Sequence, residues 1–218
     1  AERVFEQEGM VVGFTGDGLM AMWGAPSPQP DHADRAVEAA RAMLRAVEGF
    51  NDGWQSRLPE RLRLGIGIHA GKAQVGNVGS RRSPKYGPRG PMVNLASRVE
   101  GATKAFGCAL LITEATRAAL TRPVPCRALG PVRLRHIEGE VVLHEVARRD
   151  LESWDEVRRT YEEAFAHFRA RNHDEAVGLL GPWLRRYPED GPAKALRKRA
   201  AAAINDGETP HHPVWVLE

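Results

Sequence analysis

The sequence predicts an α+β fold, in which one mostly antiparallel sheet carries helices on one face. Residues 10–15 and 19–23 are short apolar runs joined by Gly-Asp-Gly, the pattern of a β-hairpin. Residues 31–50 repeat apolar side chains at helical spacing. Residues 63–71 alternate apolar residues with glycine and histidine, which is the period of a strand.

Composition places the chain among globular proteins. It has 218 residues, of which 42% are hydrophobic and 27% charged, enough for one sizeable domain plus an appendage or for two small domains. The net charge of +3 suits a phosphate-bearing ligand and does not demand a nucleic-acid partner.

Cysteine usage and hydropathy indicate the compartment. Cys108 and Cys126 are isolated, so neither a disulfide framework nor zinc-ligand spacing is present. No apolar run approaches the roughly 20 residues of a membrane span. Residues 1–8 are too charged for a signal peptide. We therefore expect a cytoplasmic protein with no membrane segment in this chain.

The hairpin turn places one carboxylate, Asp17, at its tip. A carboxylate there is well placed to hold a hard divalent cation such as Mg²⁺. Aspartate is also a good turn former in its own right, and the spacing leaves both interpretations open.

The two segments after the hairpin predict a helix and a strand. Asp31 is placed to cap the helix 31–50, and Asp34 lies where acidic groups suit the positive end of the helix dipole. In the strand 63–71, glycines thin one face and allow close backbone approach. His69 is a candidate ligand or base, or a hydrogen-bonded structural histidine.

Residues 79–91 form a basic stretch punctuated by proline and glycine, and a loop is expected. Arg82 and Lys85 are its candidate phosphate-binding residues, in an electropositive flap over a polyphosphate. The alternative is a solvated connection whose charges serve solubility.

Residues 92–106 predict a second helix, which starts directly after Pro91. Asn94 and Arg98 are four residues apart and therefore project from the same face. An amide that can bond a sugar oxygen and a guanidinium that can fork onto a phosphate suit a nucleotide. Such pairs are also common on exposed helices.

The rest of the first half predicts a strand at 108–113 and a short helix at 114–120. Three closing strands are expected at 127–129, 132–135 and 140–146, with turns at Gly130-Pro131 and Glu138-Gly139. Composition shifts at residues 148–150, which divides the chain into domains 1–147 and 151–218.

The second half predicts three helices: residues 154–171, 174–187 and 192–204. The first two match the spacing of one tetratricopeptide-type helix pair. One such repeat cannot bury its own apolar face, so it should dock on the first domain or on a partner protein. The basic residues Lys194, Arg197, Lys198 and Arg199 form a solvated face or a nucleic-acid patch. His211-His212 is either a metal-binding pair or simply an exposed pair. Trp215 is expected to hold the tail in place.

Several stretches together resemble a known family. The segments GDGLMAMWGAP (16–26), RLGIGIHAGKAQVGNVGS (63–80) and VNLASRVEGATKAFG (93–107), in this order, are similar to the catalytic domain of class III nucleotidyl (adenylate/guanylate) cyclases. LLITEAT (110–116) continues the match, and the helical tail ending in PVWVLE resembles the C-terminal extension of some bacterial members. The resemblance covers roughly residues 1–147.

This resemblance implies a ferredoxin-like core that forms a head-to-tail homodimer with active sites at the interface. The implied reaction converts a nucleoside triphosphate, here expected to be ATP, to a 3′,5′-cyclic nucleotide and pyrophosphate in intracellular signalling. Two metal ions, Mg²⁺ or Mn²⁺, are implied. By position, Asp17 would bind metal, while Asn94 orients the ribose and Arg98 stabilises the transferring phosphate. Asp17 of one chain would serve a site completed by Asn94 and Arg98 of the other.

The chain also departs from the family pattern. The family's first metal carboxylate would lie on a strand before residue 1, so the chain as given is expected to be weak or inactive alone. The adenine-reading lysine position falls on Gly13 and its partner aspartate position on Pro91, and neither residue can bond a base edge. The prolines 84, 88 and 91 are expected to prevent the strand that the family has there. A KYGP-like loop is similar to that of a bacterial subgroup, which would make this a variant pocket.

Two functions of different class follow from the resemblance. One is a metal-dependent cyclase with unusual base recognition. The other is a degenerate cyclase-homology domain that binds nucleotide or dimerises, and signals through the helical tail. An acidic residue on an upstream strand would favour the first, and its absence the second.

Overall fold

The structure is a computed structural model of the chain. It describes all residues except 81–82, 148–152, 206–212 and 218, and it does not describe the side chains of 78–80, 83 and 84. Its helices are α1 (Glu2–Phe5), α2 (His32–Gly53), α3 (Pro91–Phe106), α4 (Glu114–Ala118), α5 (Trp154–Arg169), α6 (His173–Arg186) and α7 (Gly191–Asn205). Its strands are β1 (Met10–Thr15), β2 (Gly18–Met22), β3 (Ile66–Ile68), β4 (Gln74–Ser80), β5 (Ser83–Arg89), β6 (Leu110–Thr113), β7 (Cys126–Leu134), β8 (Val141–Val146) and β9 (Trp215–Leu217).

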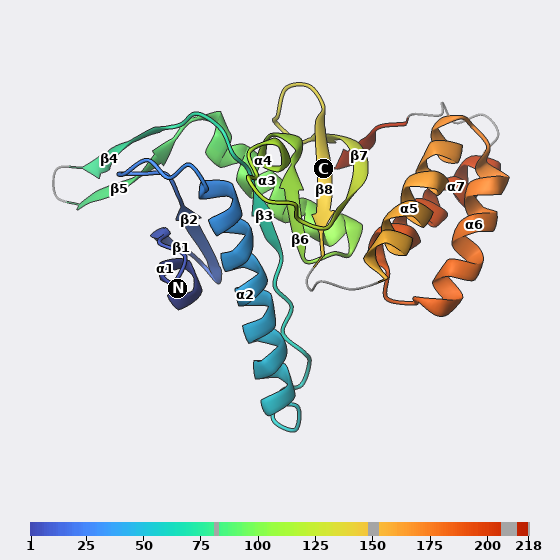
Figure 1. The fold of residues 1–218 in the computed structure, drawn as a ribbon, viewed down its shortest axis with the longest axis horizontal. Coiled ribbons are helices and arrows are strands. Elements are labelled where there is room, and N and C mark those ends of the chain that lie inside the picture. The colour runs from blue at the N-terminus through green and yellow to red at the C-terminus, as the bar shows by residue number, and fades with distance from the viewer. Residues whose placement is uncertain (81–82, 148–152, 206–212, 218) are drawn as a thin grey trace.

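The described strands form a five-stranded sheet of order β3-β6-β8-β7-β9 and two separate hairpins, β1–β2 and β4–β5. β6, β8 and β7 pair antiparallel, while β3 and β9 join the two edges in parallel. Figure 1 shows the β4–β5 hairpin projecting at one end of the molecule and the α5–α7 bundle at the other. The predicted α+β class is confirmed.

Both faces of the five-stranded sheet are covered, which refines the expectation of helices on one face. Val37, Ala40 and Leu44 of α2 pack with Leu110 and Ile112 in one buried cluster. The opposite face belongs to a larger cluster that joins α3, β7, β8 and the α5–α7 bundle. Alternate residues of β6 therefore serve two different cores.

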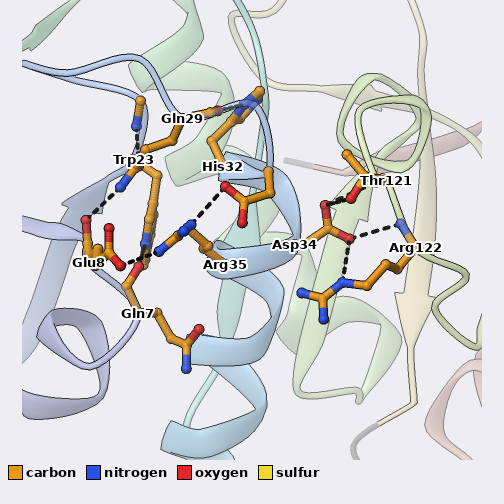
Figure 2. Close-up of polar contacts among 11 residues, drawn as sticks. Gln7, Glu8, Trp23, Gln29, His32, Asp34, Arg35, Thr121 and Arg122 are labelled. Carbon is orange, nitrogen blue, oxygen red and sulfur yellow. Dashed lines mark hydrogen bonds and ion pairs between the residues drawn. The ribbon is translucent and has the colours of Figure 1, made fainter.

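The N-terminus of α2 differs from the expected capping pattern. Asp31 is at the N-cap position but makes no side-chain cap hydrogen bond; its carboxylate pairs with Arg35 at 2.8 Å, which lowers the Asp31 pKa. Asp34 is buried and accepts hydrogen bonds from the backbone N–H groups of Thr121 (2.9 Å) and Arg122 (3.1 Å), as Figure 2 shows. Burial favours neutral Asp34, but these hydrogen bonds prevail and its pKa is lowered.

The predicted loop at 79–91 is wrong for most of its length. Residues 83–89 form β5, whose Pro88 and Pro84 lie opposite Val75 and Gly79 of β4. Proline cannot donate to a ladder, but β5 pairs with β4 in a two-stranded ribbon, where a missing donor is tolerated at the free edge.

A second error concerns Gly130-Pro131, predicted as a turn between two strands. Both residues lie inside β7, which runs without interruption past β8. The register shifts between Ala128 and Gly130, and Gly130 has φ +101°, a conformation that glycine adopts readily. Phe165 of α5 lies against Gly130, where a side chain would overlap its ring.

The three C-terminal helices are confirmed, and they pack on the first half of the chain, which is one of the two predicted alternatives. Ala164, Phe168, Ala176 and Leu180 of the proposed repeat are buried in the cluster that includes β7. Likeness to a tetratricopeptide repeat and the division at 147/151 stay predictions, and His211-His212 lies outside the described residues.

The fixed position of Trp215 is also confirmed. It is buried in β9, and its indole N–H donates to the Leu129 carbonyl at 3.0 Å. In the basic run, Lys194, Arg197 and Lys198 are exposed. The Arg199 guanidinium instead lies over the Trp215 ring, 4.6 Å from its centroid.

Candidate active site

Asp17 occupies the tip of the predicted hairpin. Thr15 pairs with Gly18, so Gly16 and Asp17 form a two-residue connection. Gly16 has φ +62°, which a side chain would make unfavourable. The Asp17 carboxylate is exposed. The hairpin therefore presents an acidic group to solvent at a defined position.

The base of this hairpin is fixed to α2 by polar contacts between segments (Figure 2). The Trp23 indole N–H donates to the Gln7 carbonyl at 2.9 Å, and the Gln29 amide donates to the Glu8 carbonyl at 3.0 Å. The Glu8 carboxylate pairs with Arg35 of α2 at 2.9 Å. No sequence pattern identified these contacts, because each partner is ordinary in its own segment.

α3 carries the other two predicted site residues. Asn94 and Arg98 are exposed, whereas Leu95, Val99 and Phe106 are buried. The expectation that the amide and the guanidinium share an exposed face is confirmed, because they lie four residues apart in one helix.

Two glycines of the β3 segment set the position of α3. A Cβ at Gly67 would overlap the backbone of Val99 and Glu100, and one at Gly65 would overlap the Thr103 hydroxyl. The predicted role of these glycines in close backbone approach is confirmed. The helix lies directly on β3 as a result.

β5 connects the hairpin with α3. Val12 is the bulged residue of β1, and a Cβ at Gly87 of β5 would overlap its side chain. β5 then runs through Gly90, whose φ is +123°, into Pro91, the first residue of α3. A Cβ added at Gly13 would meet no atom within 4 Å.

His69 is hydrogen-bonded, as one of the two interpretations predicted. Its Nδ1 lies 2.9 Å from the Thr113 hydroxyl, and its Nε2 lies 3.0 Å from the Met92 sulfur in the first turn of α3. Burial lowers the His69 pKa, which favours the neutral ring.

The phosphate-binding residues are only partly described. Lys85 is exposed on β5, and Arg82 lies outside the described residues. Within the described part of the chain, no hydrogen bond or ion pair joins Asp17 to Asn94 or Arg98. Two hollows of about 200 and 460 Å³ lie elsewhere, along α2, and none of these three residues lines them.

Asp17 is a single carboxylate, which suits a magnesium-type ion only if a ligand supplies the other donors. Among the described residues, no group of three or more His, Cys, Asp or Glu side chains is placed to hold a metal. Mg²⁺ is usually held by one or two carboxylates together with substrate phosphates and water, and does not need an all-protein cage. An exposed carboxylate such as Asp17 suits that mode.

Comparison with known proteins decides the family. The family model described as "Adenylate and Guanylate cyclase catalytic domain" matches residues 4–147. The chain belongs to this family. The cyclase domain thus includes the hairpin, α3 and the five-stranded sheet except β9.

The relatives agree with this assignment. Adenylate cyclase 1 of Rhizobium meliloti is 36% identical over 147 residues, covering 67% of this chain and 22% of that protein. The adenylate cyclase of Anabaena cylindrica is 37% identical over 127 residues, covering 56% of this chain and 24% of that protein. The chain thus spans less than a quarter of the length of either relative.

Solved structures confirm the fold. The adenylyl cyclase CyaB from P. aeruginosa matches with a TM-score of 0.62 and 28% identity, over 69% of this chain and 78% of that one. The guanylyl cyclase Cya2 matches with a TM-score of 0.58 and 32% identity, over 67% of this chain and 73% of that one.

Among the described helices of our chain, none is long and apolar enough to cross a membrane.

Proposed function

We propose that this domain converts ATP to 3′,5′-cyclic AMP and pyrophosphate as a head-to-tail homodimer. The observation that supports the proposal is that two separate elements each expose part of the expected site: Asp17 lies on the β1–β2 hairpin, and Asn94 and Arg98 lie on one face of α3. Two of the relatives are named adenylate cyclases, which favours ATP.

Each residue would have a distinct role in this reaction. Asp17 would hold Mg²⁺ or Mn²⁺, which when bound supplies charge neutralisation for the triphosphate. Asn94 would bond the ribose so that its 3′ oxygen faces the α-phosphorus, and Arg98 would stabilise negative charge on the transferring phosphate. Lys85 would approach the phosphates from β5.

A homodimer would bring these groups together. In the single chain, Asp17 and the α3 pair belong to different exposed elements and make no direct contact among the described residues. A second copy would place its α3 against the first copy's hairpin, which is a common way for symmetric oligomers to complete a site.

A second candidate is a nucleotide-binding or dimerising regulatory module without catalysis. Gly13 has no side chain, and Pro91 has neither a backbone N–H nor a polar side chain, so the two expected base-recognition positions offer no side-chain hydrogen bond. Such a module would signal through the helical tail.

The two candidates are separated by assaying the natural full-length protein with ATP or GTP and Mn²⁺. The cyclase proposal expects cyclic nucleotide that falls at least about 100-fold in Asp17→Ala and Arg98→Ala. Lys104→Ala, an exposed change on the same helix, serves as the control. Product that persists in both variants would refute the assigned roles, and nucleotide binding without product would favour the regulatory module.

A further inference from the structure

The C-terminal segment contacts the end of α3 at two separate points. The first is Gly191, where α7 begins. A Cβ at Gly191 would overlap the carbonyl oxygens of Phe106 and Gly107, so the α7 backbone lies directly against the last turn of α3. Gly107 ends that helix in the left-handed conformation, with φ +63°.

The second contact point is Trp215 of β9. Its ring meets the Phe106 ring edge to face, with centroids 4.8 Å apart, and both side chains are buried. The Trp215 N–H bond to the Leu129 carbonyl orients the indole, and Arg199 lies over its face. Phe106, the last residue of α3, therefore packs directly against β9 of the tail.

The loop before α7 is itself fixed to the sheet. Asp190 receives two hydrogen bonds from Arg127 of β7, at 2.6 and 2.9 Å. The same carboxylate accepts the backbone N–H of Ala193 in the first turn of α7 at 3.1 Å. Gly191 consequently has little freedom to move away from α3.

We propose that Gly191 and Trp215 are positioning residues, which fix the orientation of α3 and so the placement of Asn94 and Arg98. This inference rests on the proposed cyclase function. α3 is one uninterrupted helix, so displacement of its C-terminal end moves Arg98, two turns away, as part of the same body. A misplacement of about 1 Å in an active site can lower the rate about 100-fold.

The test uses Gly191→Ala in the natural full-length protein, with Gly178→Ala as the matched control. Gly178 also lies in a helix of the tail, and a Cβ there would meet nothing within 4 Å. Trp215→Phe is a milder second variant that keeps the ring contact with Phe106 and removes the indole donor, so a test remains if Gly191→Ala does not fold.

The first measurement is amide hydrogen exchange, which does not depend on catalysis. Gly191→Ala should speed exchange along α3 and leave α2 unchanged. The second measurement is steady-state kinetics with ATP and Mn²⁺. We expect kcat to fall about tenfold or more while KM stays within about twofold, because the affected groups act in the transition state. Gly178→Ala should change neither measurement.

The double variant Gly191→Ala/Arg98→Lys separates an effect on the position of Arg98 from a general loss of folded protein. The share of the kcat effect that acts through Arg98 is lost in that background, so the effect of Gly191→Ala should shrink to about threefold or less, with the remainder acting through Asn94. A full-sized effect there, or unchanged kcat in both Gly191→Ala and Trp215→Phe, would overturn the inference. A wild-type protein that makes no cyclic nucleotide would overturn the proposed function and the catalytic role of the contact, whereas altered α3 exchange would still report the contact itself.

Discussion

Arg127 and Asp190 form a two-pronged ion pair between the sheet and the helical tail. The Arg127 guanidinium is 2% exposed and also pairs with Glu145 at 2.6 Å. Burial opposes its charge, but the two carboxylates prevail and raise the Arg127 pKa. The tail is thus attached to the cyclase domain through a buried guanidinium, whose charge is unfavourable without carboxylate partners.

Removal of one partner of this pair should be costly. Asp190→Ala leaves the buried Arg127 without its two-pronged acceptor and should lower the free energy of unfolding by about 3–5 kcal/mol. Glu189→Ala, next to it in sequence and exposed, should change it by less than about 0.5 kcal/mol. Urea unfolding of both variants measures the difference, and equal stabilities would contradict the attachment.

Two glycine substitutions should change the stability of the protein in opposite directions, because Gly67 lies against the α3 backbone whereas Gly49 has open space around it. Gly67→Ala forces a methyl group into the α3 backbone and should destabilise the protein by about 1–3 kcal/mol or more. Gly49→Ala, in α2 with open space around its Cβ, should stabilise it by about 0.5–1 kcal/mol. Thermal unfolding measures both, and a neutral Gly67→Ala would show that α3 can shift without cost.

One half-buried histidine, His69, and one buried histidine, His144, predict that the protein is less stable in mild acid. Burial lowers the pKa of His69, and also that of His144 despite an opposing hydrogen bond to Glu114. As the pH falls below about 6.5, the unfolded chain protonates both rings before the folded protein does, so the free energy of unfolding decreases. The double variant His69→Gln/His144→Gln should show a flatter dependence between about pH 7 and pH 5 in chemical denaturation. An unchanged slope would mean that other groups titrate there.

Base selectivity should respond to two substitutions on the hairpin and α3. Gly13 has open space for a longer side chain, and Pro91 is exposed at the first position of α3, where an acidic residue suits the helix dipole. If these positions read the base as the proposed site implies, Gly13→Lys with Pro91→Asp should raise the preference for ATP over GTP by about tenfold or more, because a donor and an acceptor would then face the base edge. Competition kinetics with both nucleotides measures the ratio, and no change would remove these positions from the base site.

Helices and the hairpin were predictable because their signals are local. Helical spacing of apolar residues located α2, α3 and α5–α7 within a few residues, and the Gly16-Asp17 connection identified its own turn. The spacing of four residues singled out Asn94 and Arg98, and both are exposed on the same helix in the structure.

The errors have a common physical cause, which is that tertiary pairing overrode local signals. Pro88 and Pro131 usually mark breaks, yet β5 tolerates one in a two-stranded ribbon and β7 absorbs the other beside a bulge. β9 has only three residues, too few to show the two-residue period of a strand, and it forms by parallel pairing of Trp215–Leu217 with β7. The Arg127–Asp190 pair joins residues 63 positions apart, which no spacing rule can find.

Complementation between two inactive variants tests the central claim most directly. Asp17→Ala and Arg98→Ala versions of the full-length protein should each be inactive alone. If the two residues act across a subunit boundary, half of the dimers in an equal mixture carry one intact site, and activity should return to about a quarter of the wild-type level. A mixture no more active than either variant alone would contradict the account.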